Sequence, residues 1–168
     1  MSLPATPPQT IGPFFHIGLD VPGTECLVPA DHPAAVRIEG RVLDGAGDPV
    51  RDGLVELWDA QGGRFGRCAT DGQGRYHFLA AKPGAGVSGG EAAEAPHLNV
   101  SVFARGLLDR LVTRIYFPDE AAANSADPVL SMIADPRQRA TLVARAEAAV
   151  LHFDIHLQGD QETVFFAL

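Results

Sequence analysis

The sequence predicts an all-β fold: a single-domain, mixed β-sandwich with short helices in its C-terminal third and an extended N-terminal arm. The chain has 168 residues, enough for one domain with its own hydrophobic core. It contains 18 Gly and 13 Pro but only 20% charged residues, which favours short elements joined by turns. Several segments alternate apolar and polar residues with the period of a β-strand. We expect the arm at residues 1–35 and the sandwich domain at residues 36–168.

The arm is rich in proline. Its prolines forbid a continuous helix and favour extended chain, at Pro4, Pro7, Pro8, Pro13, Pro22, Pro29 and Pro33. Phe14, Phe15 and Ile17 supply apolar side chains that must pack against something. Either this domain or a neighbouring chain can provide that surface, and the sequence leaves both possibilities open.

The domain contains a series of predicted strands separated by turn residues. Leu98, Val100 and Val102 alternate with His97 and Asn99, for example, so these last two share one face of a strand. The predicted strands are residues 36–42, 54–58, 75–79, 97–103, 111–117 and 151–157. Residues 141–147 are a candidate hairpin partner for the last strand, although their alanines also suit a helix.

Two short helices are predicted in the C-terminal third. Asp127 precedes Pro128, and Asp135 precedes Pro136. An acidic N-cap directly before a proline is a typical start of a helix.

Composition limits the possible partners. The net charge of -8 argues against nucleic acid, and an anionic ligand would need a local positive group. No segment approaches the length of a membrane span, and no leader is evident. Cys26 and Cys68 are expected to be reduced thiols that fill buried space. We therefore expect a soluble, cytoplasmic protein.

The segment around His97 is the most informative part of the chain. Two histidines at positions 97 and 99 would be placed to share one metal, but Asn99 offers only a weakly ligating amide oxygen. His152 and His156 would lie about 13 Å apart on a strand, too far to share one ion. We expect them on a solvated face and assign no role to His16, His32 or His77. Taken alone, the sequence contains no recognisable catalytic motif.

Arg105 is a candidate binding residue. It follows the predicted strand 97–103 and precedes Gly106, so its guanidinium is expected to leave the sheet at a loop. The planar guanidinium can hold a carboxylate by two parallel hydrogen bonds. An ordinary exposed arginine is the simpler alternative.

The chain resembles the intradiol ring-cleaving dioxygenases over nearly its whole length. The core of the resemblance is GRVLD at residues 40–44 with GDPV at 47–50, VELWDA at 55–60, TDGQGRY at 70–76 and KPG at 82–84. Further segments are similar to one chain type of a two-chain member of the family: QTIGPFFHIGL at 9–19, APHLN at 95–99, FARG at 103–106 and GDQETVFF at 159–166.

The resemblance also shows which iron ligands are missing. The family's iron-bearing chain holds Fe(III) with two tyrosines and two histidines. Here His97 matches the first histidine, Asn99 replaces the second, and Phe65 stands near the first tyrosine. Residues 84–94 contain no tyrosine, and the two tyrosines of the chain, Tyr76 and Tyr116, match structural positions. The resemblance therefore implies no metal ligand set and no catalytic residue in this chain alone.

What the resemblance implies instead is a shared active site. A homologous β chain would hold the Fe(III), this α chain would complete the pocket across their interface, and αβ pairs would form a higher oligomer. Thr10, Gly12 and Pro13 match the arm that lines the substrate pocket, and Arg105 matches the arginine near the substrate carboxylate. The implied reaction is cleavage of protocatechuate by O2 to 3-carboxy-cis,cis-muconate, within the β-ketoadipate pathway of aromatic catabolism.

The sequence also leaves room for two other functions. A stand-alone β-sandwich binding module that has lost the iron site would be a free monomer without large exposed apolar surfaces. An independent iron enzyme that uses His97 with other donors is disfavoured by the missing tyrosines.

Overall fold

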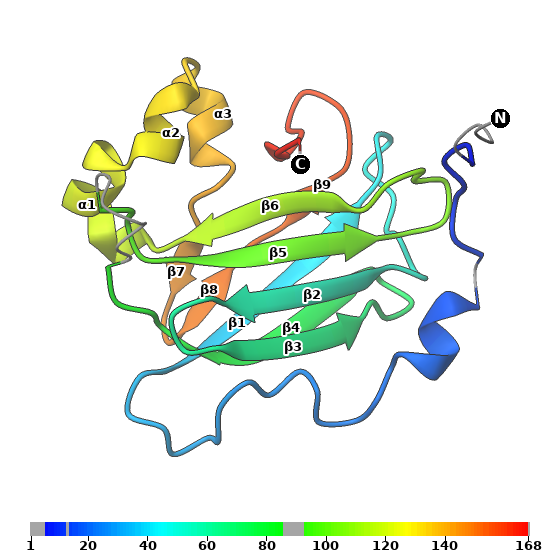
Figure 1. Ribbon diagram of the computed structural model, residues 1–168, viewed down its shortest axis with the longest axis horizontal. Coiled ribbons are helices and arrows are strands. Elements are labelled where there is room, and N and C mark those ends of the chain that lie inside the picture. The colour runs from blue at the N-terminus through cyan, green and yellow to red at the C-terminus, as the bar shows by residue number, and fades with distance from the viewer. Residues whose placement is uncertain (1–5, 13, 86–92, 168) are drawn as a thin grey trace, which may run out of the picture.

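A computed structural model describes residues 6–12, 14–85 and 93–167, which form two β-sheets stacked face to face (Figure 1). One sheet is antiparallel, with the order β3 (Arg64–Ala69), β2 (Leu54–Asp59), β5 (His97–Phe103) and β6 (Leu111–Tyr116). The other has the order β4 (Arg75–Ala81), β1 (Ala35–Leu43), β8 (Val150–His152) and β7 (Arg145–Glu147), and β9 (Ile155–His156) also pairs with β1. Because β1 pairs antiparallel with β4 and parallel with β8 and β9, the predicted mixed β-sandwich is confirmed.

The hydrophobic core lies between the sheets and follows from the period of the strands. In β5, Leu98, Val100 and Val102 are at most 1% exposed, whereas His97 and Asn99 lie on the opposite face. The other strands contribute inward side chains that include Ile38, Val42, Leu57, Tyr76, Phe78 and Ile115. The predicted sharing of one face by His97 and Asn99 is therefore confirmed.

Short helical segments follow β6: η2 (Pro118–Glu120), α1 (Ala121–Ala126), α2 (Pro128–Met132) and α3 (Pro136–Ala140). Asp127 caps α2 by accepting from the backbone N–H groups of Val129 and Leu130, and Asp135 caps α3 through Arg137. Both predicted helix starts are confirmed. The segments η2 and α1 were not predicted, because no side-chain cap marks their beginnings. No helix among the described residues is both long and apolar enough to cross a bilayer.

The single strand predicted at residues 151–157 is wrong, because β8 and β9 are separated at Phe153 and Asp154. A side chain replaces a main-chain acceptor at this break: Asp154 Oδ1 accepts the backbone N–H of Arg41 at 2.9 Å. The hydroxyl of Tyr76 donates to the carbonyl of Phe153 at 2.5 Å and holds the break against the core. Hydrogen bonds of this kind cannot be read from apolar alternation.

Two other elements of the sandwich differ from the prediction. β3 was not predicted, since its sequence RFGRCA shows little apolar alternation and the strand is defined by its pairing with β2. Within residues 141–147, only β7 is a strand. It pairs antiparallel with β8, so the predicted hairpin is confirmed for this part.

The arm is partly docked on its own domain. Its described residues include one 3₁₀ turn, η1 (Phe15–Gly18). Leu79 exchanges backbone hydrogen bonds with Glu25 and Leu27, so the second half of the arm runs along the edge of β4. Phe14, by contrast, remains 74% exposed. The domain boundary after residue 35 stays a prediction.

The two cysteines have different environments. Both are free thiols, and Cys68 is buried as predicted. Cys26 is exposed, so the prediction of a buried filler is wrong for this residue. It lies on the arm where the arm pairs with the edge of β4, outside the space between the sheets.

Gly40 is a position in β1 that has no room for a side chain. A β-carbon there would overlap the carbonyl group of Phe153 and crowd the Tyr76 hydroxyl. We expect Gly40→Ala to lower the free energy of unfolding by about 2–3 kcal/mol, because backbone and a buried hydrogen bond must shift. Chemical denaturation measures this change. Gly72→Ala is the matched control, since a β-carbon at Gly72 meets open space; equal stability of the two variants would contradict the structure.

Candidate functional site

Strand β5 separates two regions of functional interest. His97 begins the strand, and Arg105 lies just beyond its last residue, Phe103. With a rise of about 3.3 Å per residue, the two ends of β5 lie about 20 Å apart. The helices gather near the His97 end, and the N-terminal arm passes the opposite end (Figure 1). A substrate with one aromatic ring is too short to contact both positions within this chain.

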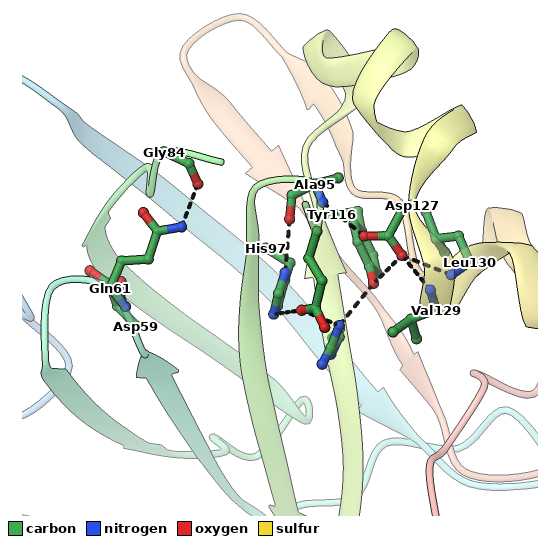
Figure 2. Close-up of polar contacts among 11 residues, drawn as sticks. Asp59, Gln61, Gly84, Ala95, His97, Tyr116, Asp127, Val129 and Leu130 are labelled. Atoms are coloured by element: carbon green, nitrogen blue, oxygen red, sulfur yellow. Dashed lines mark hydrogen bonds and ion pairs between the residues drawn. The ribbon is translucent and has the colours of Figure 1, made fainter. Parts of the chain in front are cut away.

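His97 lies between the carbonyl group of Ala95 and the carboxylate of Glu94 (Figure 2). Its Nδ1 lies 2.8 Å from the carbonyl oxygen of Ala95, and a carbonyl only accepts, so Nδ1 carries the proton. Burial lowers the pKa of His97, and Arg114 lowers it further, although the Ala95 hydrogen bond and the Glu94 carboxylate raise it. The second ring nitrogen, Nε2, lies 3.5 Å from Glu94 Oε2. The imidazole therefore faces a carboxylate that is already engaged by a cation.

That cation is Arg114. Its Nη1 lies 3.0 Å from Glu94 Oε2 and 3.2 Å from the hydroxyl oxygen of Tyr116. Its guanidinium carbon is 5.8 Å from the ring centroid of Phe166. Arg114 also lies directly opposite Asn99 in the register of β5 and β6. Arg114 thus engages the Glu94 carboxylate, the acidic group beside His97 that could otherwise bind a metal.

Asp127 connects this region to the helices (Figure 2). Its buried carboxylate accepts from the backbone N–H groups of Val129 and Leu130 through Oδ1, and from that of Ala95 through Oδ2 at 2.8 Å. The hydroxyl of Tyr116 lies 3.2 Å from Oδ1 and donates to it. One carboxylate therefore joins the start of α2, the end of β6 and the residues that lead into β5.

These residues do not fit ferric iron in the ligand set that the resemblance implies. Asn99 offers a neutral amide, and the exposed Phe65 has no donor atom. Burial raises the pKa of Tyr116 to about 12 and raises the pKa of Tyr76 well above its ordinary value. Both hydroxyls already donate to protein oxygens, Tyr116 to Asp127 Oδ1 and Tyr76 to the carbonyl of Phe153. The part of the chain that the structure describes contains no cluster of three or more His, Cys, Asp or Glu side chains suited to a metal.

At the other end of β5, Arg105 leaves the sheet as predicted. Its side chain is 67% exposed, and its Nε lies 2.9 Å from Oδ2 of Asp52, which is 18% exposed. Among the described residues, the guanidinium has no other partner, so its two-pronged outer edge is free. A pocket of about 370 Å³ opens here, lined by Asp44, Pro49, Val50, Arg51, Asp52, Ala104, Arg105 and Leu157.

The N-terminal arm reaches the same place. The backbone N–H of Gly106 donates to Thr10 Oγ1 at 2.6 Å. Gly106 has a φ of 90°, which lets the chain turn directly after Arg105. A β-carbon at Gly12 would meet open space, with none of the described residues in contact with it. Pro13 lies outside the described residues. The structure thus brings together Thr10 and Arg105, which the sequence separates widely.

Several residues of these two regions were missed in the sequence. Asp52 belongs to a turn between β1 and β2 and carries no motif that points to Arg105. Glu94 and Arg114 form their ion pair across different segments, and Asp127 was predicted only as a helix cap. The only available signal was the resemblance around 103–106, which marked Arg105 but not its partner.

A larger pocket, of about 620 Å³, lies over the other sheet, away from both regions. Its charged residues have both signs: Arg37, Glu39, Arg41, Asp71, Arg75, Arg145 and Asp154. His77 and His152 flank Glu39 on the neighbouring strands of this face. The mixed charges do not select one class of ligand.

Comparison with known proteins identifies the family. A family described as Dioxygenase matches residues 11–159. The protocatechuate 3,4-dioxygenase alpha chain of Pseudomonas putida is 40% identical over 98% of this chain and 96% of its own length. This chain belongs to the intradiol dioxygenase family. The protocatechuate 3,4-dioxygenase beta chain of Burkholderia cepacia is 36% identical over 79% of this chain and 67% of its own length. The predicted membership of the intradiol dioxygenase family is confirmed.

Solved structures of intradiol dioxygenases share the fold. The dioxygenase domain of a carbohydrate-binding fusion protein from Streptomyces sp. SirexAA-E has a TM-score of 0.56 at 22% identity and covers 94% of this chain and 92% of that one. The 3-chlorocatechol 1,2-dioxygenase of Rhodococcus opacus 1CP has a TM-score of 0.61 at 17% identity and covers 82% and 65%. At these identities the likeness concerns the fold alone.

The surroundings of His97 allow a direct test of the missing ligand set. We expect Asn99→His to bind no ferric iron, because both tyrosine ligands would still be missing and Arg114 would still engage the Glu94 carboxylate. Metal analysis and the visible absorption of an iron-phenolate bond measure the outcome. Asn99→Gln serves as the control for a change of shape at this position. A stoichiometric ferric site in Asn99→His would show that the missing histidine alone explains the lack of fit.

Proposed function

We propose that this chain is the iron-free α subunit of a protocatechuate 3,4-dioxygenase, and that it completes the active site of a homologous β chain that holds Fe(III). Relatives with the alpha-chain name match nearly the full length of this chain. The complex uses O2 to cleave protocatechuate to 3-carboxy-cis,cis-muconate, a step of the β-ketoadipate pathway. In this proposal residues 1–35 are the arm, residues 36–168 are the domain, and the αβ pairs form a larger cytoplasmic oligomer.

The hydrogen bond between Thr10 and Gly106 is the observation that carries this proposal. It joins the arm to the loop of Arg105 at the end of β5 that is remote from His97. If Arg105 served a metal site at the position of His97, the substrate would have to span about 20 Å. The reacting ring is therefore held at a site to which another chain contributes the metal.

The chemistry of this chain is binding and exclusion of water. The free edge of Arg105 holds the substrate carboxylate by two charge-assisted hydrogen bonds. A local cation is needed because the chain as a whole carries a net charge of -8 and repels anions. The hydrogen bond of Thr10 to Gly106 brings the arm to the Arg105 loop, and Thr10, Gly12 and Pro13 line the substrate pocket in this proposal and limit the access of water.

Exposed apolar side chains on the arm and on the Arg105 loop support a partner chain over a free binding module. Phe14 is 74% exposed, Ile17 is 66% exposed, and Leu108, in the loop after Arg105, is 58% exposed. A chain that acts alone is expected to expose less large apolar surface. An independent iron enzyme is disfavoured because Asn99 and Phe65 stand where the resemblance implies ligands, and because Arg114 already engages the Glu94 carboxylate beside His97.

Replacement of Arg105 tests the assigned role. In the αβ complex, we expect Arg105→Ala to lower kcat/KM for protocatechuate by about 10- to 100-fold, which corresponds to the loss of a charge-assisted pair of hydrogen bonds. Iron content should stay at the value of the unmodified complex. Steady-state kinetics and metal analysis measure both quantities. Arg110→Ala, a change at another exposed arginine of the same loop, is the control. Loss of iron with full affinity for protocatechuate would contradict the assignment.

A further inference from the structure

We infer that Asp52 is a positioning residue for Arg105: its carboxylate sets the guanidinium so that the free edge faces the carboxylate of the bound substrate. This inference rests on the proposed function of Arg105. The contact that carries it is the 2.9 Å approach of Arg105 Nε to Asp52 Oδ2. Because Nε belongs to the inner side of the guanidinium, the ion pair leaves the outer edge available.

The backbone around Asp52 is rigid. The buried hydroxyl of Thr70 donates to the carbonyl of Val50 at 2.7 Å and accepts the N–H of Gly53 at 2.9 Å. The backbone N–H of Thr70 also donates to the carbonyl of Gly53 at 2.9 Å. The turn that carries Asp52 is therefore tied to the sandwich on both sides. The position of the Asp52 carboxylate is therefore well defined, and its contact can orient the exposed side chain of Arg105.

The backbone of Arg105 is fixed, but its side chain is oriented only by Asp52 among the described residues. Its backbone is held on one side by the buried Ala104 and on the other by the Gly106–Thr10 hydrogen bond. Its long side chain is 67% exposed and has no other described partner. An unrestrained arginine samples many rotamers, and fixing it costs conformational entropy when a ligand binds. Since exposed ion pairs contribute little to stability, the value of the Asp52 contact is the orientation of the guanidinium.

The arrangement also affects specificity. Asp52 offsets part of the charge of Arg105, so charge alone does not decide which anion binds. What remains free is a planar edge with two parallel N–H directions, and this matches a carboxylate in shape. Asp52 is thus expected to sharpen the preference for a carboxylated catechol over catechol itself.

Kinetics of the αβ complex with Asp52→Asn test the inference. We expect the KM for protocatechuate to rise about tenfold, because a displaced guanidinium loses its alignment with the substrate. The kinetic constants for catechol, which has no carboxylate, should not change. A role of Asp52 in folding alone would affect both substrates equally. Asp109→Asn removes the same charge from an exposed aspartate of the Arg105 loop, and it should leave both substrates unaffected.

The double variant Asp52→Asn with Arg105→Ala separates this inference from the proposed function. If Asp52 acts through Arg105, the double variant should be no worse with protocatechuate than Arg105→Ala alone. An effect of Arg105→Ala with an unchanged or lower KM in Asp52→Asn would overturn the positioning role and leave the proposed function intact. Full activity of Arg105→Ala would overturn both.

Discussion

The extended course of β5 is the constraint on which the other features of this chain depend. β5 is paired on both sides, by β2 and β6, and its inner face is buried against the opposite sheet. Its length therefore fixes the separation of His97 from the loop of Arg105. No rotation of side chains can bring these two positions to one small substrate. Whatever chemistry one end supports, the other end must serve a different purpose.

The two ends differ in how their charges are satisfied. At the His97 end, Glu94 and Arg114 pair with one another, and Asp127 accepts hydrogen bonds from three backbone N–H groups as well as from Tyr116. The charged groups of Glu94, Arg114 and Asp127 thus all have partners among the described residues. At the other end, Arg105 has one partner among the described residues and an unused edge, and the arm meets this loop through the Thr10–Gly106 hydrogen bond. The hydrogen bonds and ion pairs at the His97 end hold the fold together, whereas Arg105 at the other end has N–H groups available for a ligand.

The sequence predicted most of the sandwich because alternation and turn residues are local signals. β5, the two capped helices and the exit of Arg105 from the sheet all follow from neighbouring residues. The break at Phe153 and Asp154 depends on Tyr76 and Arg41 of other strands, and β3 depends on its pairing with β2. Asp52 was missed for the same reason: it meets Arg105 only when two loops fold to one end of the sandwich. The roles of Thr10, Gly12 and Pro13 remain predictions that came from the resemblance.

In the proposed function, this chain provides part of a shared pocket whose metal belongs to another chain. The native mass and iron content of the complex, purified gently through a tag on this chain from its own host, test it most directly. The account predicts a second chain of similar fold in equal amount and one iron per pair of chains. A lone, iron-free monomer would contradict it and would favour the stand-alone binding module.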